Sequence, residues 1–196
     1  MSRSWAGTSL TDRKAARREQ LLAAGLELLG TGGSAAVSVR AVCRQSKLTE
    51  RYFYESFADR EELVLAVYEH VAGQARQALI DAVPEKTAAP AARAKAAVTA
   101  FVELMVDDPR KGHVLLLAPI TDPALSARGV ALLPSFAALV REQLPETMDE
   151  AERELTAVGL VGALTNLFTS YLGGALKVSR VRLIEHCVRL LAQAGS

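Results

Sequence analysis

The side chains with the clearest chemical potential lie between Ser38 and Glu62, in the stretch SVRAVCRQSKLTERYFYESFADREE. Hydroxyl and guanidinium groups recur there, and both donate hydrogen bonds to phosphate oxygens. Arg51 has the forked donor geometry that pairs with guanine, and Glu50 could accept a hydrogen bond from the cytosine amino group. Glu50 is better explained as a negative charge that stabilises a helix N-terminus. These residue types point to nucleic-acid binding.

Two short helices joined by a tight turn would position these side chains. Ser38 is a suitable N-cap for a first helix over residues 39–44, and residues 45–48 would form the turn. Thr49 would then cap a second helix. A helix-turn-helix of this size lays its second helix in the major groove of DNA.

This region resembles the DNA-binding region of TetR-family transcriptional regulators. The family pattern is a Thr- or Ser-capped helix, a turn, a recognition helix that ends in an aromatic pair, and then Phe-x-x-Lys-Glu-x-Leu. The matching residues are Ser38, Leu48, Thr49, Phe53, Tyr54, Phe57, Arg60, Glu61 and Leu63. Lys47 stands where the family commonly has a turn glycine, so we expect either a left-handed backbone there, at some cost, or a different turn. Arg60 replaces the usual lysine, which keeps the charge and changes the phosphate geometry.

The resemblance implies an all-α fold of about nine helices in two domains. Residues 1–58 would form the N-terminal helix-turn-helix DNA-binding domain, and residues 59–196 the C-terminal helical ligand-binding and dimerisation domain. The residues expected at phosphates are Ser38, Thr49, Tyr54 and Arg60. Those expected at base edges or the nearby backbone are Arg40, Glu50, Arg51 and Tyr52.

The resemblance also implies a homodimer, paired through its last two long helices, that binds double-stranded DNA at a palindromic operator. The expected function is a repressor that a small hydrophobic effector releases from DNA. Its pocket would lie among helices five to eight, where apolar walls with a few polar groups suit such a ligand. The residues expected to line it are Phe101, Met105, Leu117, Phe136, Asn166, Ser170 and Tyr171, each of which could equally be core.

Charge is spread unevenly along the 196-residue chain, whose net charge is +1. Residues 1–60 carry ten Lys and Arg against six Asp and Glu, and residues 61–196 carry thirteen against sixteen. A basic N-terminal third suits a chain that touches phosphate at one end, although chance could give the same asymmetry. Half of the residues are hydrophobic and only 5% are aromatic, so the core must be rich in Leu, Val and Ala, which favours helices.

Hydrophobic periodicity and capping signals predict further helices over residues 11–29, 60–81, 98–105, 113–118, 149–176 and 180–193, and one that begins at Pro123. Residues 83–92 are the clearest linker. Pro134 lies inside the helix that begins at Pro123, so this helix should kink or split near Leu132.

Residues 155–176 carry no charge and are long enough to span a bilayer. Their glycines, threonines and serine, with no flanking aromatic belt, favour a helix buried in a soluble assembly. Cys43 and Cys187 are the only cysteines, and two distant cysteines without a signal peptide indicate a reducing compartment. We therefore expect a cytoplasmic protein with no membrane contact.

No catalytic or metal-binding pattern stands out. None of the three histidines lies in a Ser-base or Cys-base motif, and no His/Cys cluster has zinc spacing, so we expect neither an enzyme nor a cofactor. Two other functions stay open. A dimeric DNA-binding regulator without a small-molecule ligand would have a closed, fully packed body. A helical enzyme or carrier with an incidental DNA head would turn over a small molecule and fail to bind DNA.

Overall fold

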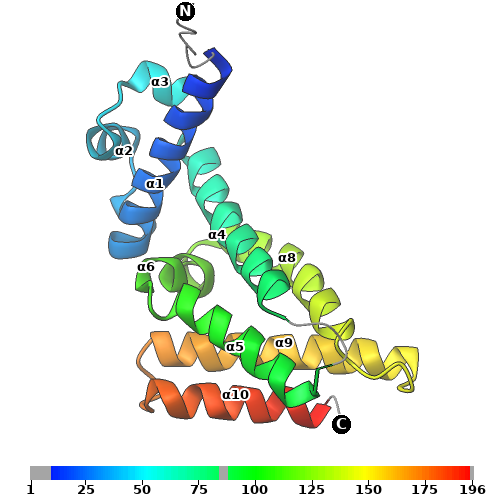
Figure 1. The fold of residues 1–196 in the computed structure, drawn as a ribbon. Helices are drawn as coiled ribbons and strands as arrows, with labels where there is room; N and C mark the ends of the chain where they lie inside the picture. The colour runs from blue at the N-terminus through cyan, green and yellow to red at the C-terminus, as the bar shows by residue number, and fades with distance from the viewer. Residues whose placement is uncertain (1–9, 84–87, 195–196) are drawn as a thin grey trace, which may run out of the picture.

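Within residues 10–83 and 88–194, which the computed structural model describes, every regular element is helical. A small head of three helices stands on a larger helical body, and α4 runs from one to the other (Figure 1). The head is α1 (Leu10–Ala36), α2 (Val39–Ser46) and α3 (Glu50–Tyr54), followed by α4 (Arg60–Ala82). The body is α5 (Pro90–Met105), α6 (Pro109–Gly112), the π-helical turn η1 (His113–Leu117), α7 (Ala118–Thr121), α8 (Pro123–Arg141), α9 (Glu150–Leu172) and α10 (Arg180–Ala194). If α6, η1 and α7 are counted as one continuous segment, these residues form nine helical segments, so the predicted all-α fold is confirmed.

The head forms as the capping residues predict. The helical backbone of α1 breaks at Gly33, whose φ of 67° and ψ of −174° are open to glycine, so α1 runs a full turn further than the predicted end at Leu29. Ser38 has an extended backbone, and its side-chain oxygen accepts a hydrogen bond from the Ala41 amide at 3.2 Å. The first helix of the helix-turn-helix therefore begins where the sequence placed it.

Lys47 ends α2 in the left-handed conformation, with φ of 57° and ψ of 30°. Its amide closes the helix by donating to the Cys43 carbonyl. The turn has the left-handed geometry that glycine normally adopts in this pattern. For a lysine this conformation costs about 1 kcal/mol of folding free energy.

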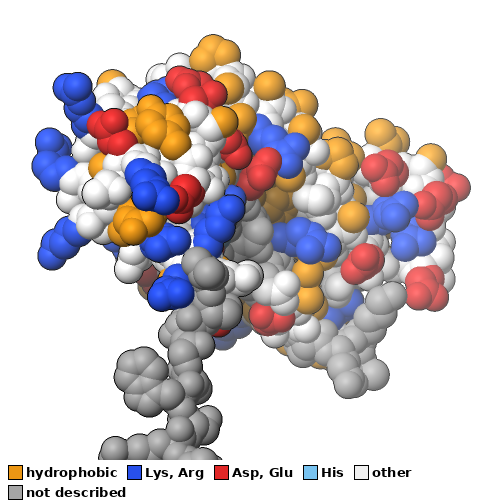
Figure 2. Space-filling view, turned by 90° about the horizontal axis from the view of Figure 1, so that it is seen from above, with side chains coloured by type: hydrophobic (Ala, Val, Ile, Leu, Met, Phe, Trp, Pro, Cys, Tyr) orange, Lys and Arg blue, Asp and Glu red, His pale blue; other side chains and the backbone are white. Residues whose placement is uncertain are grey.

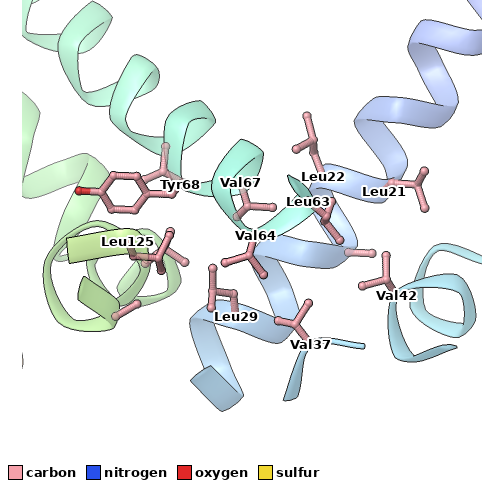
Figure 3. Close-up of a cluster of buried hydrophobic side chains, with 14 of the residues drawn as sticks. Leu21, Leu22, Leu29, Val37, Val42, Leu63, Val64, Val67, Tyr68 and Leu125 are labelled. Atoms are coloured by element: carbon pink, nitrogen blue, oxygen red, sulfur yellow. The ribbon is translucent and has the colours of Figure 1, made fainter. Parts of the chain in front are cut away.

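One cluster of buried side chains joins the head to the near half of the body (Figure 3). Leu63 and Val67 on α4 lie against Leu21 and Leu22 on α1, and the same cluster continues to Leu125 on α8. α1 and α4 approach closely at Gly25, where a Cβ atom would lie 2.8 Å from a methyl carbon of Val67. Because the core is shared, the head is held at a fixed orientation on α4.

Three boundaries differ from the sequence prediction. α5 begins at Pro90, inside the predicted linker, since proline suits the first turn of a helix; residues 84–87 of that linker lie outside the described part of the chain. α8 is not split by Pro134 but continues through it, and the Val130 carbonyl loses its usual amide partner. α9 ends at Leu172 because two glycines follow, of which Gly174 has a φ of 77°.

Candidate nucleic-acid interface and body cavity

The N-terminus of α3 presents an exposed threonine. Thr49 occupies the N-cap position with an extended backbone, and its carbonyl accepts hydrogen bonds from the Tyr52 and Phe53 amides. Its side chain makes no cap hydrogen bond, contrary to the usual role of threonine at this position. The hydroxyl is thus available to an outside acceptor such as a phosphate oxygen.

The aromatic residues of α3 divide between core and surface. Phe53 is fully buried, whereas Tyr54 is 57% exposed and packs edge-to-face on Phe53, with ring centroids 5.4 Å apart. The half-buried Tyr52 lies under the guanidinium of Arg17 on α1, at 4.2 Å from the ring centroid. Tyr54 therefore has its hydroxyl at the surface, while Tyr52 also helps to dock α3 onto α1.

Arg51 and Glu50 are both exposed on the same helix. The Arg51 side chain is 84% exposed and its Nε donates to Glu55 one turn later at 3.1 Å. Glu50 lies in the first turn of α3, where its charge favours the helix. Burial, with a smaller effect from Glu50, raises the pKa of the Cys43 thiol on the neighbouring α2. Cys43 is therefore a packing residue.

Arg60 of α4 donates hydrogen bonds to the backbone of the segment that joins α1 to α2. Its Nε donates to the Val37 carbonyl at 2.8 Å and its Nη2 to the Ser34 carbonyl at 2.5 Å, while Nη1 pairs with Glu61 at 2.9 Å. The guanidinium is thus directed at the protein backbone, just ahead of the Ser38 cap. This loop-holding position is a role that the sequence did not suggest.

Basic side chains surround the helix-turn-helix. Arg40, Arg44 and Lys47 follow one another at helical spacing along the exposed face of α2 and its turn. Figure 2, which looks onto the head from above, shows Lys and Arg side chains gathered over this end of the molecule. Arg40 is among the residues predicted to contact DNA and Arg44 is not, although Arg44 lies one helical turn after Arg40 on the same exposed face.

A cavity of about 560 Å³, partly open to solvent, lies in the body between α4, α5, α8 and α9. Its walls are mostly aliphatic and aromatic, and Phe101 of α5 and Phe136 of α8 are among them. At the end near the head lie Tyr68, Ser126 and Gly129; at the far end, where α5 begins and α8 stops, lie Arg93 and Gln143. Burial raises the pKa of the Tyr68 hydroxyl, so this group stays neutral and serves as a hydrogen-bond donor.

Of the seven residues predicted for the pocket, only Phe101 and Phe136 line this cavity. Met105 is fully buried in the core that the head and body share. Asn166 lies on the exposed side of α9 and accepts a hydrogen bond from Ser170 at 3.0 Å. The other two also lie outside the lining, namely Leu117 in η1 and Tyr171 in the cluster between α5, α9 and α10.

Two polar contacts join the body to the head beside α1. Asp122, the N-cap of α8, accepts a hydrogen bond from the Ser34 hydroxyl at 2.8 Å. Arg110, which follows the start of α6, pairs with Glu27 on α1 at 2.8 Å. α6 reaches α1 closely at Gly30, where a Cβ atom would lie 2.8 Å from the Arg110 Cα. The cavity wall and the helix-turn-helix head are therefore in direct contact.

An apolar face on α9 and α10 is exposed in the single chain. Leu155 and Val158 on α9 are 69% and 54% exposed, and Val181 on α10 is 62% exposed. Gly159 and Gly162 lie in the same stripe of α9, and nothing lies within 4 Å of where their Cβ atoms would be. By length and composition α8 and α9 could cross a membrane, although the core helix of a soluble protein passes the same test.

Comparison with known proteins agrees with this architecture. Residues 21–67 match the family described as bacterial regulatory proteins, tetR family. The fold is similar to a transcriptional regulator from Rhodococcus sp. (TM-score 0.75, 18% identity, covering 90% of this chain and 95% of that one).

Two regulators called FadR, one of them described as a fatty acid degradation regulator, have a similar fold. The FadR of Bacillus halodurans has a TM-score of 0.72 at 14% identity, over 90% of this chain and 94% of that one. The FadR of Bacillus subtilis, in complex with stearoyl-CoA, has a TM-score of 0.70 at 16% identity, over 90% and 98%. Comparison with curated proteins gives no sequence match. The match identifies residues 21–67 as the helix-turn-helix region of the tetR family of bacterial regulatory proteins, and along nine-tenths of its length the chain shares the fold of the transcriptional regulators named above.

Proposed function

We propose that the protein is a homodimeric repressor in the cytoplasm that binds a palindromic operator and is released from it by a hydrophobic small molecule. The cavity of about 560 Å³ carries this proposal. Its size and apolar walls are typical of small-molecule sites, whereas close-packed interiors leave few voids larger than a water molecule. The cavity therefore favours this function over the alternative, a dimeric DNA-binding regulator without a small-molecule ligand.

A similar fold that holds a ligand supports the same choice. The FadR of Bacillus subtilis, which is 16% identical, has a structure in complex with stearoyl-CoA. At this identity the likeness concerns the fold alone. It nevertheless supports a ligand with a long apolar part, which the predominantly aliphatic and aromatic lining of the cavity also favours.

Dimerisation would cover the exposed face of α9 and α10. Leu155 and Val158 would be buried against the partner, and Gly159 and Gly162 would let its helices approach closely. A dimer places two α3 helices on one side of the assembly, so each can enter a major groove about 34 Å from the other.

DNA contacts would then come from the head. Ser38, Thr49 and Tyr54 would donate to phosphates from their hydroxyls, and the exposed Arg51 would read a base, with Arg40, Glu50 and Tyr52 nearby. Arg60 would act differently from the residues that touch DNA. It would fix the loop ahead of Ser38, because its Nε and Nη2 are bonded to carbonyls of that loop.

A footprint on the DNA that flanks the protein's own gene tests this function. We expect a protected region with dyad symmetry, and an affinity that falls with salt at a slope of about −0.9 per phosphate contact. Thermal-shift screening with small hydrophobic compounds should then find molecules that also release the DNA. An asymmetric or absent footprint would contradict the DNA-binding part. Compounds that bind without affecting DNA affinity would contradict the release mechanism.

A further inference from the structure

Arg93 differs from the other arginines in the part of the chain that the structure describes. Those that are partly buried, such as Arg17, Arg60 and Arg180, each lie within 4 Å of a carboxylate. Those without such a partner, such as Arg40 and Arg76, are exposed. Arg93 is partly buried and forms no ion pair with any described carboxylate. Its charge is therefore neutralised neither by an acidic neighbour among these residues nor by full exposure to water.

The hydrogen bonds of Arg93 are also incomplete. Its Nη1 donates to the side-chain oxygen of Gln143, a neutral amide, at 2.8 Å. Its Nε is buried and has no hydrogen-bond partner. A buried donor without a partner costs about 1–3 kcal/mol, more when it carries charge, so an unpaired guanidinium N–H in a cavity wall indicates a missing acceptor.

Arg93 lies at one end of an elongated apolar space. The cavity lining follows α8 from Ser126 to Val140, a distance of roughly 20 Å at the rise of an α-helix. Between Arg93 at one end and Tyr68 at the other, the walls are aliphatic and aromatic apart from Thr165. Glu142 also lines the far end but is exposed and forms no ion pair with Arg93. A ligand matched to this shape has a long apolar body and one acceptor-bearing head.

We propose that Arg93 anchors the anionic head, a carboxylate or a similar oxyanion, of an elongated amphipathic ligand whose apolar chain fills the cavity toward Tyr68. This inference rests on the proposed ligand-binding function and specifies its chemistry. Guanidinium binds carboxylates and phosphates through two parallel hydrogen bonds, for which Nε and Nη2 are the natural pair once Nη1 is engaged by Gln143.

Calorimetry with three probes of equal chain length tests the proposal, namely decanoate, 1-decanol and decyltrimethylammonium. The wild-type protein should bind decanoate more tightly than either of the others. Arg93→Met, which keeps the bulk and removes the charge, should weaken decanoate binding at least tenfold and leave 1-decanol binding unchanged. Lys95→Met, an exposed site on the same helix with the same charge change, should alter neither. Lengthening the carboxylate should strengthen binding about fourfold per added methylene while the cavity still has room.

The opposite results would overturn the proposal. These are tightest binding of the ammonium probe, no binding of any probe, equal loss of decanoate and 1-decanol in Arg93→Met, or no loss at all. Release of DNA is measured separately, by fluorescence anisotropy of the footprinted DNA. If decanoate binds through Arg93 and leaves the DNA bound, the ligand site stands and the release mechanism fails. If other compounds release the DNA and decanoate binds equally well to the wild type and to Arg93→Met, the proposed function stands and this inference fails.

Discussion

Ser34, just beyond the break in α1, donates its hydroxyl hydrogen to Asp122, the residue that caps α8, over 2.8 Å. The other Asp122 oxygen accepts from the Ala124 and Leu125 amides, and the Ser34 carbonyl accepts from Arg60 of α4. The first turn of a cavity-lining helix is therefore bonded to the loop that leads into the helix-turn-helix. A ligand that displaces α8 would act on the head through this point, provided that it binds the two arrangements with different affinities.

Ser34→Ala should reduce the coupling between ligand and DNA without removing either binding activity. A hydrogen bond to a charged group is worth about 1.5–3 kcal/mol, and coupling free energies are about 1–3 kcal/mol, so losing this bond should cut the ligand's effect on DNA affinity roughly tenfold. Anisotropy titrations of labelled operator, with and without saturating ligand, measure this directly.

Thr31→Ala is the matched control for the Ser34 substitution. Thr31 lies on the same helix and its hydroxyl bonds only to the Glu27 carbonyl, one turn back. Coupling in this variant should equal that of the wild type. If Ser34→Ala also retains full coupling, the signal does not pass through the bond between Ser34 and Asp122.

Asp122 should contribute stability that disappears in acid. Burial raises its pKa, but the hydrogen bonds from Ser34, Leu125 and Ala124, with the charge of Arg60, together lower the pKa below its usual value. Folding thus favours the ionised form, so the contribution is complete above the unfolded pKa of about 3.9 and is lost as pH falls through the lower folded value. Asp122→Asn keeps a capping side chain and lacks this titration. The difference between the melting temperatures of the two proteins should therefore be full at pH 7 and shrink as the pH falls through the lowered folded pKa; a constant difference would contradict the assignment.

Lys47→Gly should stabilise the protein by about 1 kcal/mol, because glycine adopts the left-handed conformation of this turn without the steric cost that a side chain incurs. Lys47→Ala removes the same charge and keeps a Cβ, so it should give no such gain. Urea unfolding at pH 7 separates the two effects. Equal stability in both variants would mean that the lysine, and not its backbone, determines the result.

The two best-placed groups on α3 should affect DNA binding in different ways. Tyr54→Phe keeps the edge-to-face packing on Phe53 and removes only the hydroxyl, so it should weaken binding to all sequences alike, by about 1 kcal/mol per protomer. Arg51→Ala should instead relax the base preference at one position in each half-site. A binding selection from randomised operators distinguishes the two, and the reverse pattern would exchange the assigned roles.

The head could be predicted from sequence because its signals are local. Ser38 caps the helix that follows it, and Lys47 has the left-handed conformation, which was one of the two outcomes expected for this turn. Each of these features depends on residues within about one turn along the chain, so spacing and residue type are sufficient to identify it.

The ligand cavity could not be predicted in the same way, because it depends on how distant helices pack. Asn166 and Met105 lie in apolar stretches like those of Phe101 and Phe136. Asn166 is nevertheless exposed, and Met105 is buried in the core. Arg93 directly follows the predicted linker, residues 83–92, and its significance depends on Gln143, fifty residues away. The π-helical turn η1, and the loop-holding contacts of Arg60, likewise become visible only once the chain is folded.

Gly162→Arg should convert the dimer to a folded monomer. Gly162 is helical, exposed in the single chain and has nothing within 4 Å of its Cβ position, so an arginine costs the monomer nothing and improves helix propensity by about 1 kcal/mol. In a close helix–helix interface the same side chain would collide with the partner and bury a charge. Gly73→Arg is the matched control, since Gly73 is also an exposed helical glycine with open space around it, but on α4. Light scattering after size exclusion should therefore report a monomer for Gly162→Arg and a dimer for both Gly73→Arg and the wild type. If all three proteins are dimers, the interface lies on another face of the molecule. The spacing of the two heads would then not depend on α9, so the footprint of Gly162→Arg should keep its dyad symmetry.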